Sequence, residues 1–333
     1  MVDIILADAK LTPRGSVSDV TLDWASGTDE NDFEMTIADP TAAPVRGWWW
    51  WIDGTEIGGR IDDMRTTVTS GASEVTWLGR TWTGLLASKI IRPDNGQDYL
   101  TVSGRLPNVV KSLVRRIGLD SVLTVDSDDK STVTNWVFKD PRYVDAYTGL
   151  RNLLASCGRR LDINARNNRI LLGITPVETI GNTVDSDLVD FKAETKHRTV
   201  NHLIGLGEQD LKNRYVSEWY ADSRGNVSRK QTFTGVEEVA EIYDYSAADQ
   251  QTLDDSTMKR LQELQTGGTV DVTLAESIGE RLKVDDIVTA SDHNTGLTVT
   301  AKVTKRIIKI SDGIMTASCE VGQSVVKEAI SGR

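Results

Sequence analysis

Apolar side chains recur at every second position through much of the first 85 residues, and this period of two constrains the fold more than any other feature. The pattern is clearest in Val17–Trp24 and Phe33–Ile37. Such alternation is typical of strands with one buried face. Further strands are predicted at Trp48–Ile52, Ile57–Val68 and Glu74–Leu78, the last two joined as a hairpin. Residues 1–88 are therefore expected to form a β-domain.

In residues 89–195 the spacing of apolar residues changes, and part of the segment shows the period of a helix. Apolar residues at helical spacing predict a helix over Leu106–Ile117, with proline in its first turn and glycine after its end. A second helix is predicted to begin at Asp140-Pro141 and to end before Gly158. Strands are predicted at Val133–Phe138, Arg160–Asn164 and Arg169–Ile174. This segment is expected to be an α/β middle domain.

Strand patterns return in residues 196–333, interrupted by one helix that Ser246 is predicted to cap. The predicted strands are Val200–Leu206, Arg214–Tyr220, Val227–Phe233, Thr269–Leu274, Asp286–Ala290, Leu297–Ile310 and Ile314–Val321. The whole chain is therefore predicted to be mainly β, with an α+β insert.

The balance of charge limits the classes of partner. The chain of 333 residues carries 49 acidic against 38 basic side chains, a formal net charge of −11. Proteins that bind nucleic acid need basic patches to contact the phosphates, so we expect no sequence-specific nucleic-acid binding. No apolar run is long enough to span a bilayer, and the N-terminus lacks a signal-peptide pattern, so we expect no membrane insertion by this chain.

Side chains that carry enzymatic chemistry are sparse. His197, His202 and His293 show no metal-binding spacing, and neither Cys157 nor Cys319 has a Cys or His neighbour at such spacing. No nucleophile elbow, phosphate-binding loop or dinucleotide-binding loop occurs. We therefore predict no enzyme, no cofactor and no metal site.

Two acidic loops leave calcium binding open. They contain Asp94, Asn95 and Asp98 in one case, and Asp126, Asp128 and Asp129 in the other. Calcium prefers such oxygen-rich loops, but neither has the ligand spacing of a calcium-binding hand. Solvated turns are favoured, because Asp and Asn are common in turns for purely local reasons.

Four of the nine tryptophans are consecutive, at Trp48, Trp49, Trp50 and Trp51. Side chains alternate along a strand, so two of these rings are expected to face the core and two the opposite side. Exposed indole rings are costly unless a ligand or another subunit covers them. We predict a subunit interface at these four residues, with a carbohydrate-binding face as the alternative.

Short motifs follow one another in a fixed order along the chain. They are Glu56–Arg60 (EIGGR), Gly79–Leu86 (GRTWTGLL), Lys89–Pro93 (KIIRP) with Gly96 and Tyr99, Arg142 with Leu150–Leu154, Asn201–Gly207 (NHLIGLG) and Leu282–Val288 (LKVDDIV). This order resembles that of the phage tail hub proteins, the baseplate-hub-like proteins at the tail tip of long-tailed phages. One position departs from the pattern, because Asp285 stands where these hubs usually have glycine.

The resemblance implies two β-barrel-like hub domains, residues 1–88 and 196–333, flanking the α/β middle domain, residues 89–195. It implies a structural virion protein, made in the host cytoplasm, that caps the tail tube as a homotrimer. The implied partners are tail tube or distal tail proteins, the tape-measure protein, and tail fibre or receptor-binding proteins.

A ring of this kind encloses a central channel for DNA ejection. An acidic channel wall is expected to let DNA pass without adhering. Two alternatives stay open: a carbohydrate-binding tail-tip module that contacts the host cell surface, and a tail-associated cell-wall hydrolase.

Overall fold

The computed structural model describes residues 2–38, 44–70, 72–139, 141–181, 189–194, 200–223, 225–265, 269–274, 281–291, 298–322 and 325–327. Contacts divide the chain into two compact units. Unit 1 comprises residues 1–191 and 272–333, and unit 2 comprises residues 192–271. In the described ranges, no helix is long and apolar enough to cross a membrane.

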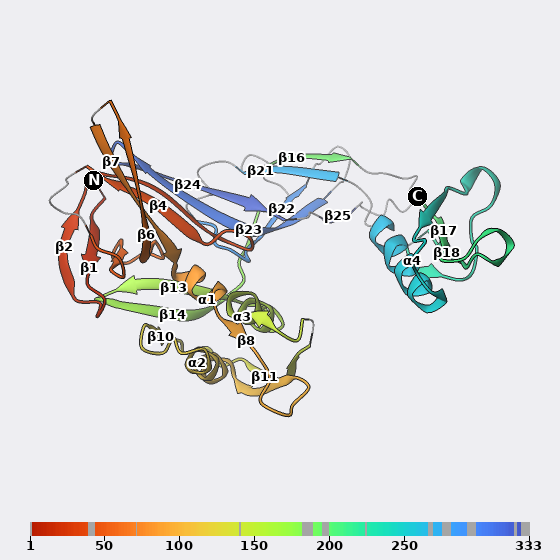
Figure 1. Cartoon of the computed structure of the whole chain (residues 1–333), viewed down its shortest axis with the longest axis horizontal. Coiled ribbons are helices and arrows are strands. Elements are labelled where there is room, and N and C mark those ends of the chain that lie inside the picture. The colour runs from red at the N-terminus through yellow and green to blue at the C-terminus, as the bar shows by residue number, and fades with distance from the viewer. Residues whose placement is uncertain are drawn as a thin grey trace. The chain divides into compact units, whose positions relative to one another are not determined.

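Unit 1 is built on a large, mainly antiparallel sheet (Figure 1). The strand order is β15-β22-β23-β3-β4-β7-β6-β5-β1-β2, with β24 and β25 both pairing with β23. The bounds are β1 Ile4–Ala7, β2 Pro13–Val17, β3 Val20–Gly27, β4 Asp32–Ile37, β5 Trp49–Trp51, β6 Gly58–Thr69, β7 Ala72–Thr81, β15 Thr179–Ile180, β22 Ile287–Ser291, β23 Thr298–Ser311, β24 Ile314–Val321 and β25 Val325–Lys327. The prediction of a mainly β chain is confirmed.

Strand β23 connects two parts of this sheet. One stretch of it pairs with β3 and β24, and another pairs with β22 and β25. An apolar cluster containing Leu22, Met35 and Ile308 lies over the first part, and a smaller cluster around Val288 and Val303 lies over the second. The pairings among the described strands form an open path, so no closed barrel is seen there.

The helical part of unit 1 packs against this sheet. Its elements are α1 Trp82–Ala87, β8 Ile90–Ile91, β9 Leu100–Arg105, α2 Leu106–Arg116, β10 Leu123–Val125, β11 Thr132–Phe138, β12 Val144–Asp145, α3 Ala146–Ala155, β13 Arg159–Arg166 and β14 Arg169–Pro176. Helix α2 matches its prediction, because Leu106, Val110 and Leu113 recur on its buried face. One large apolar cluster joins α1, α2 and α3 to β13 and β14.

The predicted start of the second helix is wrong. Helix α3 begins at Ala146, where the carboxylate of Asp145 accepts a hydrogen bond from the Thr148 backbone N–H at 2.9 Å. Asp140 lies outside the described residues. The preceding residues instead form β12, which pairs with β8, and Val144 is buried there. The apolar residue that extends the helical periodicity thus belongs to a strand.

Unit 2 is a four-stranded sheet packed against one helix. Its order is β19-β18-β17-β20, and its elements are β17 His202–Leu206, β18 Val216–Ala221, β19 Val227–Ser228, β20 Ala240–Asp244 and α4 Gln250–Gln265. The strand predicted at Val227–Phe233 is shorter than expected, because β19 and its pairing with β18 end at Ser228. Asp249, rather than Ser246, caps α4, since its carboxylate accepts the Thr252 N–H at 2.8 Å. Beyond these elements, β16 Val189–Glu194 pairs with β21 Thr269–Leu274.

Candidate functional site

The tryptophan run alternates between two cores. Trp50 lies in the cluster over the sheet, whereas Trp49 and Trp51 lie in the cluster of the helical part. All three side chains are almost fully buried, and Trp48 is half-buried. The predicted alternation is present, but the expectation of an exposed pair is wrong. The reason is that the helical part of the same chain covers the second face of β5.

Ring geometry shows how closely these indoles are packed. The rings of Trp49 and Trp82 stack with centroids 5.9 Å apart, and Phe33 meets Trp50 edge to face at 4.8 Å. The carbohydrate-binding interpretation required exposed rings, and Trp49–Trp51 do not present them. An interface role for the run stays a prediction, in which Trp48 is the member that reaches the surface.

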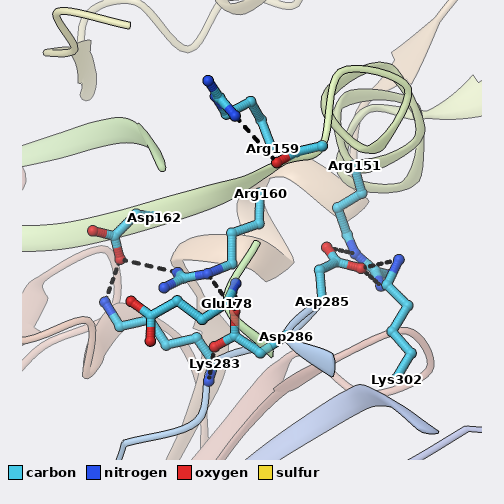
Figure 2. Close-up of polar contacts among 10 residues, drawn as sticks. Arg151, Arg159, Arg160, Asp162, Glu178, Lys283, Asp285, Asp286 and Lys302 are labelled. Carbon is cyan, nitrogen blue, oxygen red and sulfur yellow. Dashed lines mark hydrogen bonds and ion pairs between the residues drawn. The ribbon is translucent and has the colours of Figure 1, made fainter. Parts of the chain in front are cut away.

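A cluster of buried charges lies instead where α3, β13, β23 and the segment before β22 meet (Figure 2). The Arg151 guanidinium of α3 donates two hydrogen bonds to the carboxylate of Asp285, at 2.8 and 2.6 Å. The ammonium of Lys302, on β23, lies 2.6 Å from the same carboxylate. The Asp285 side chain is only 3% exposed, so its charge depends on these two cations.

The backbone of Asp285 explains why glycine is usual there. Its φ angle is +79°, in the left-handed region that non-glycine residues rarely adopt. Its N–H donates to the carbonyl oxygen of Val303 at 2.9 Å, which fixes the turn against β23. Asp285 therefore holds a backbone conformation that glycine adopts without strain, and it places a carboxylate in a buried position.

Electrostatics favour the ionised form of this carboxylate. Burial alone would raise the pKa of Asp285, but the hydrogen bonds and charges of Arg151 and Lys302 outweigh burial and lower the pKa below its ordinary value. Burial raises the pKa of the neighbouring Tyr147 to about 12, so that side chain stays neutral. The Arg151 guanidinium lies over the Tyr147 ring at 5.2 Å.

A second buried carboxylate, that of the adjacent Asp286, ties together three segments. It accepts hydrogen bonds from the backbone N–H groups of Glu178 and Lys283, at 3.0 and 2.9 Å. Its Oδ1 also lies 2.8 Å from Nε of Arg160, on β13. Lys283 in turn contacts the carboxylate of Asp162 (Figure 2). Removing Asp285 leaves the Arg151 guanidinium buried without its hydrogen-bonded carboxylate, so the network holds the helical part on the sheet.

The acidic loops considered for calcium are occupied by arginines. Asp129 lies 2.6 Å from Arg159, and Asp94 lies 2.5 Å from Arg116. Across the described ranges, no group of three acidic, His or Cys side chains is arranged to hold a metal ion. Of the three histidines, His202 lies in β17, and the other two lie outside the described residues.

The face of the sheet opposite its apolar cluster forms a groove of about 780 Å³. Six carboxylates line it, from Asp23, Glu30, Asp32, Glu34, Asp62 and Asp63, together with Arg46 and Arg80. Burial, and then the charges of Glu30 and Glu34, raise the pKa of Asp32. Cross-strand ion pairs such as Arg65–Glu34, at 2.7 Å, neutralise part of this surface.

Motifs far apart in the sequence meet around α3. Helix α1, from GRTWTGLL, packs against α3, and β8, from KIIRP, pairs with β12 just before α3 begins. Arg151 of α3 then pairs with Asp285 of LKVDDIV. Arg151 was not predicted as a functional residue, because it lies within an apolar helical stretch. The unusual Asp285 was the one signal in the sequence that pointed to this ion pair.

Comparisons with known proteins give structural likenesses only. No family model matches the chain, and no curated protein matches its sequence. The 43 kDa tail protein of prophage MuSo2 from Shewanella oneidensis aligns over 96% of this chain and 98% of its own, with 13% identity and a TM-score of 0.49. A chain of the phage P2 baseplate, in its activated conformation with Ca, aligns over 100% of both chains, with 10% identity and a TM-score of 0.47.

A third likeness is to the prophage tail protein gp18 from Listeria monocytogenes EGD-e. It covers 96% of this chain and 94% of that chain, with 13% identity and a TM-score of 0.46. All three solved structures are tail or baseplate proteins, the class that the ordered motifs resemble.

Proposed function

We propose that this chain is a structural virion protein, a phage tail hub at the tail tip. As a homotrimeric ring it caps the tail tube, joins the tube to the distal tip and receptor-binding apparatus, and leaves a central channel for DNA. Its role is mechanical rather than catalytic. Its neighbours are the tail tube or distal tail proteins, the tape-measure protein, and the tail fibre or receptor-binding proteins.

The convergence of the hub motifs carries this proposal. Resemblance in short motifs is weak evidence when each stands alone. Here GRTWTGLL forms α1, which packs against α3, and KIIRP forms β8, which pairs with β12 just before α3. The matching motif residue Asp286 of LKVDDIV pairs with Arg160 of β13, in the same helical part. Segments from distant parts of the sequence thus serve one structural purpose, which favours a shared origin over chance similarity.

The two related hub domains of the proposal are residues 1–88 and 196–333. Two apolar clusters along the sheet support a division of the β-structure into two parts, one around Leu22, Met35 and Ile308 and one around Val288 and Val303. Strand β23 contributes residues to both clusters. The predicted boundaries at residues 88 and 195 remain part of the proposal as approximate limits of the middle domain.

The groove over β3, β4, β7 and β6 is proposed as part of the channel wall. Carboxylates outnumber cations along it, and like charges repel a phosphate backbone. Asp32 and Asp63 supply negative charge there without an ion pair in the described part of the chain. DNA is then expected to pass this surface without being held.

The test is the mass and the binding of the purified protein. Mass photometry should give a particle of about 110 kDa, three times the 36.6 kDa chain. Negative-stain images should show a ring, and the tail tube protein encoded by the same phage should co-purify with it. A chain that stays monomeric at high concentration and does not bind the tube protein would overturn the proposal.

A further inference from the structure

We propose that, within the ring, the outer edge of β24 in one copy pairs with the outer half of β6 in the next copy. This inference rests on the proposed ring and identifies the surface through which the ring is made. The occupant of each edge is a second copy of this chain, so the contact is head to tail.

Both strands have an unpaired edge. In the part of the chain that the structure describes, β24 pairs with β23 alone, and β5 covers β6 only at Gly58–Arg60. Beyond Ile61, whose backbone bonds to Trp48, the outer edge of β6 has no backbone partner among the described residues. Residues 62–69 of β6 and 314–318 of β24 therefore present open rows of backbone N–H and C=O groups there.

Protection of exposed edges is uneven across the sheet. Natural edge strands are commonly blunted by proline, by lysine or by short length. Strand β2, at one end of the main strand order, begins with Pro13 and is five residues long. Strand β24 is eight residues long and contains neither proline nor lysine. It therefore presents the less protected edge.

A row of apolar side chains crosses the sheet and reaches both open strands. Cross-strand pairing places its members in the order Met64, Trp77, Met35, Leu22, Ile310 and Met315. The four inner side chains are at most 9% exposed, whereas Met64 is 57% and Met315 is 40% exposed. Val68 and Ile314, farther along the same two strands, are also exposed. Joining β24 to β6 of the next copy in the register that places Met315 opposite Val68, and therefore Thr316 opposite Thr67, would cover these exposed apolar side chains.

Strand direction permits the pairing. Every neighbouring pair from β24 through β23, β3, β4 and β7 to β6 is antiparallel, so β6 and β24 run in opposite directions. A copy placed beside β24 in the same orientation therefore pairs antiparallel through its own β6. The two open edges are offset along the strand direction. Strand β6 continues to Thr69, well beyond Met64, whereas β24 begins at Ile314, only one residue before Met315. A closed assembly meets this offset by inclining its strands to the ring axis.

Disulfide trapping between two variants tests the contact. The background carries Cys157→Ser and Cys319→Ala, and one tagged chain carries Thr67→Cys while a differently tagged chain carries Thr316→Cys. Both positions are exposed. Within one copy, five strand spacings separate β6 from β24 by about 24 Å along the sheet. A disulfide requires Cα atoms within about 7 Å, so a bond between the two tags reports a contact between copies.

The expected result is a covalent dimer carrying both tags when the two variants are co-expressed and mildly oxidised. Each variant alone should give none, because a head-to-tail contact never places Thr67 beside Thr67. The matched control replaces Thr316→Cys by Ser16→Cys, on the edge strand β2, and should give no dimer with Thr67→Cys. A second β24 variant carries Ser318→Cys in place of Thr316→Cys, because the pairing between β6 and β24 can be shifted by two residues. Ser318 is also exposed.

The outcomes separate this inference from the proposed function. If the ring forms but neither β24 position crosslinks to Thr67, the edge contact is wrong and the hub proposal stands. If Thr67→Cys crosslinks to itself, the contact is symmetric and the head-to-tail arrangement is overturned. If the chain forms no ring in mass photometry, the proposed function itself fails.

Discussion

Arg151 in α3 and Asp285, 134 residues later, form a buried bidentate ion pair whose acidic partner has a φ angle of +79°. The pair joins the helical part of unit 1 to the strands that follow unit 2 in the sequence. The position combines an unfavourable backbone conformation with a favourable side-chain contact. Substitutions can separate these two contributions.

Asp285→Ala should destabilise the protein by about 3–5 kcal/mol, because Arg151 is then left buried with only solvent and Lys302 nearby. Asp285→Gly should cost about 1 kcal/mol less, since glycine adopts a positive φ without strain. The double variant Arg151→Met/Asp285→Gly should recover much of the loss, because no charge stays unpaired. Urea denaturation of the wild type, Asp285→Ala, Asp285→Gly, Arg151→Met and the double variant, all at one protein concentration, measures these differences. Losses from Arg151→Met and Asp285→Gly that simply add in the double variant would contradict the ion pair.

Stability should fall in acid partly through Asp285. The pKa of its carboxyl in the folded state is below its ordinary value of 3.8, so the unfolded chain binds the proton more readily. Its contribution is therefore present above the unfolded pKa and is lost as the pH falls through the folded pKa. The difference in unfolding free energy between the wild type and Asp285→Asn should be largest near about pH 6 and shrink toward about pH 3. A constant difference across this range would show that the carboxylate is not responsible.

The tryptophan run should behave as core rather than as surface. Trp50→Ala should destabilise the protein by about 3–5 kcal/mol, because the indole is fully buried against Phe33. Trp48→Ala should cost clearly less, since that ring is half-buried. Thermal unfolding of both variants checks the order. Equal losses, or a larger loss for Trp48, would contradict the arrangement of the two cores.

Position 84 should require glycine, because there is no room for a Cβ atom there. A Cβ there would lie 2.2 Å from the carbonyl oxygen of Asn31, which belongs to the loop before β4. Gly84→Ala should therefore cost about 1–3 kcal/mol through displacement of α1. Gly15→Ala, where a Cβ meets nothing within 4 Å, is the matched control and should be nearly neutral. Differential scanning fluorimetry of the two variants is sufficient to compare them.

Local features of this fold follow from the sequence. The hairpin of β6 and β7 and the helix α2 depend on alternation, turn residues and helical spacing within short windows. The boundary of α3 does not, because Val144 fits the helical period and is nevertheless held in a strand by β8. Periodicity identifies the buried residue without identifying the element that contains it.

Contacts between residues far apart in the sequence could not be predicted from such local patterns. Ile307 of β23 pairs with Ala25 of β3, although nearly the whole chain separates them. The same limit applies to the site, because nothing local to Arg151 indicates that its partner is Asp285. It also applies to Trp49 and Trp51, whose cover comes from α1, α2 and α3 rather than from another subunit. The resemblance to the tail hub proteins relates these segments by their order along the chain. The structure then shows which of them are in contact.

Strand β23 determines how the sheet would respond to a mechanical load. It is one strand of fourteen residues, bonded to β22 and β25 along one stretch and to β3 and β24 along the other. Its interstrand hydrogen bonds lie across the strand, so a pull along the strand loads many of them in shear at once. Tension applied at one apolar cluster is thus transmitted through covalent backbone to the other, and the two resist stretching as a single element.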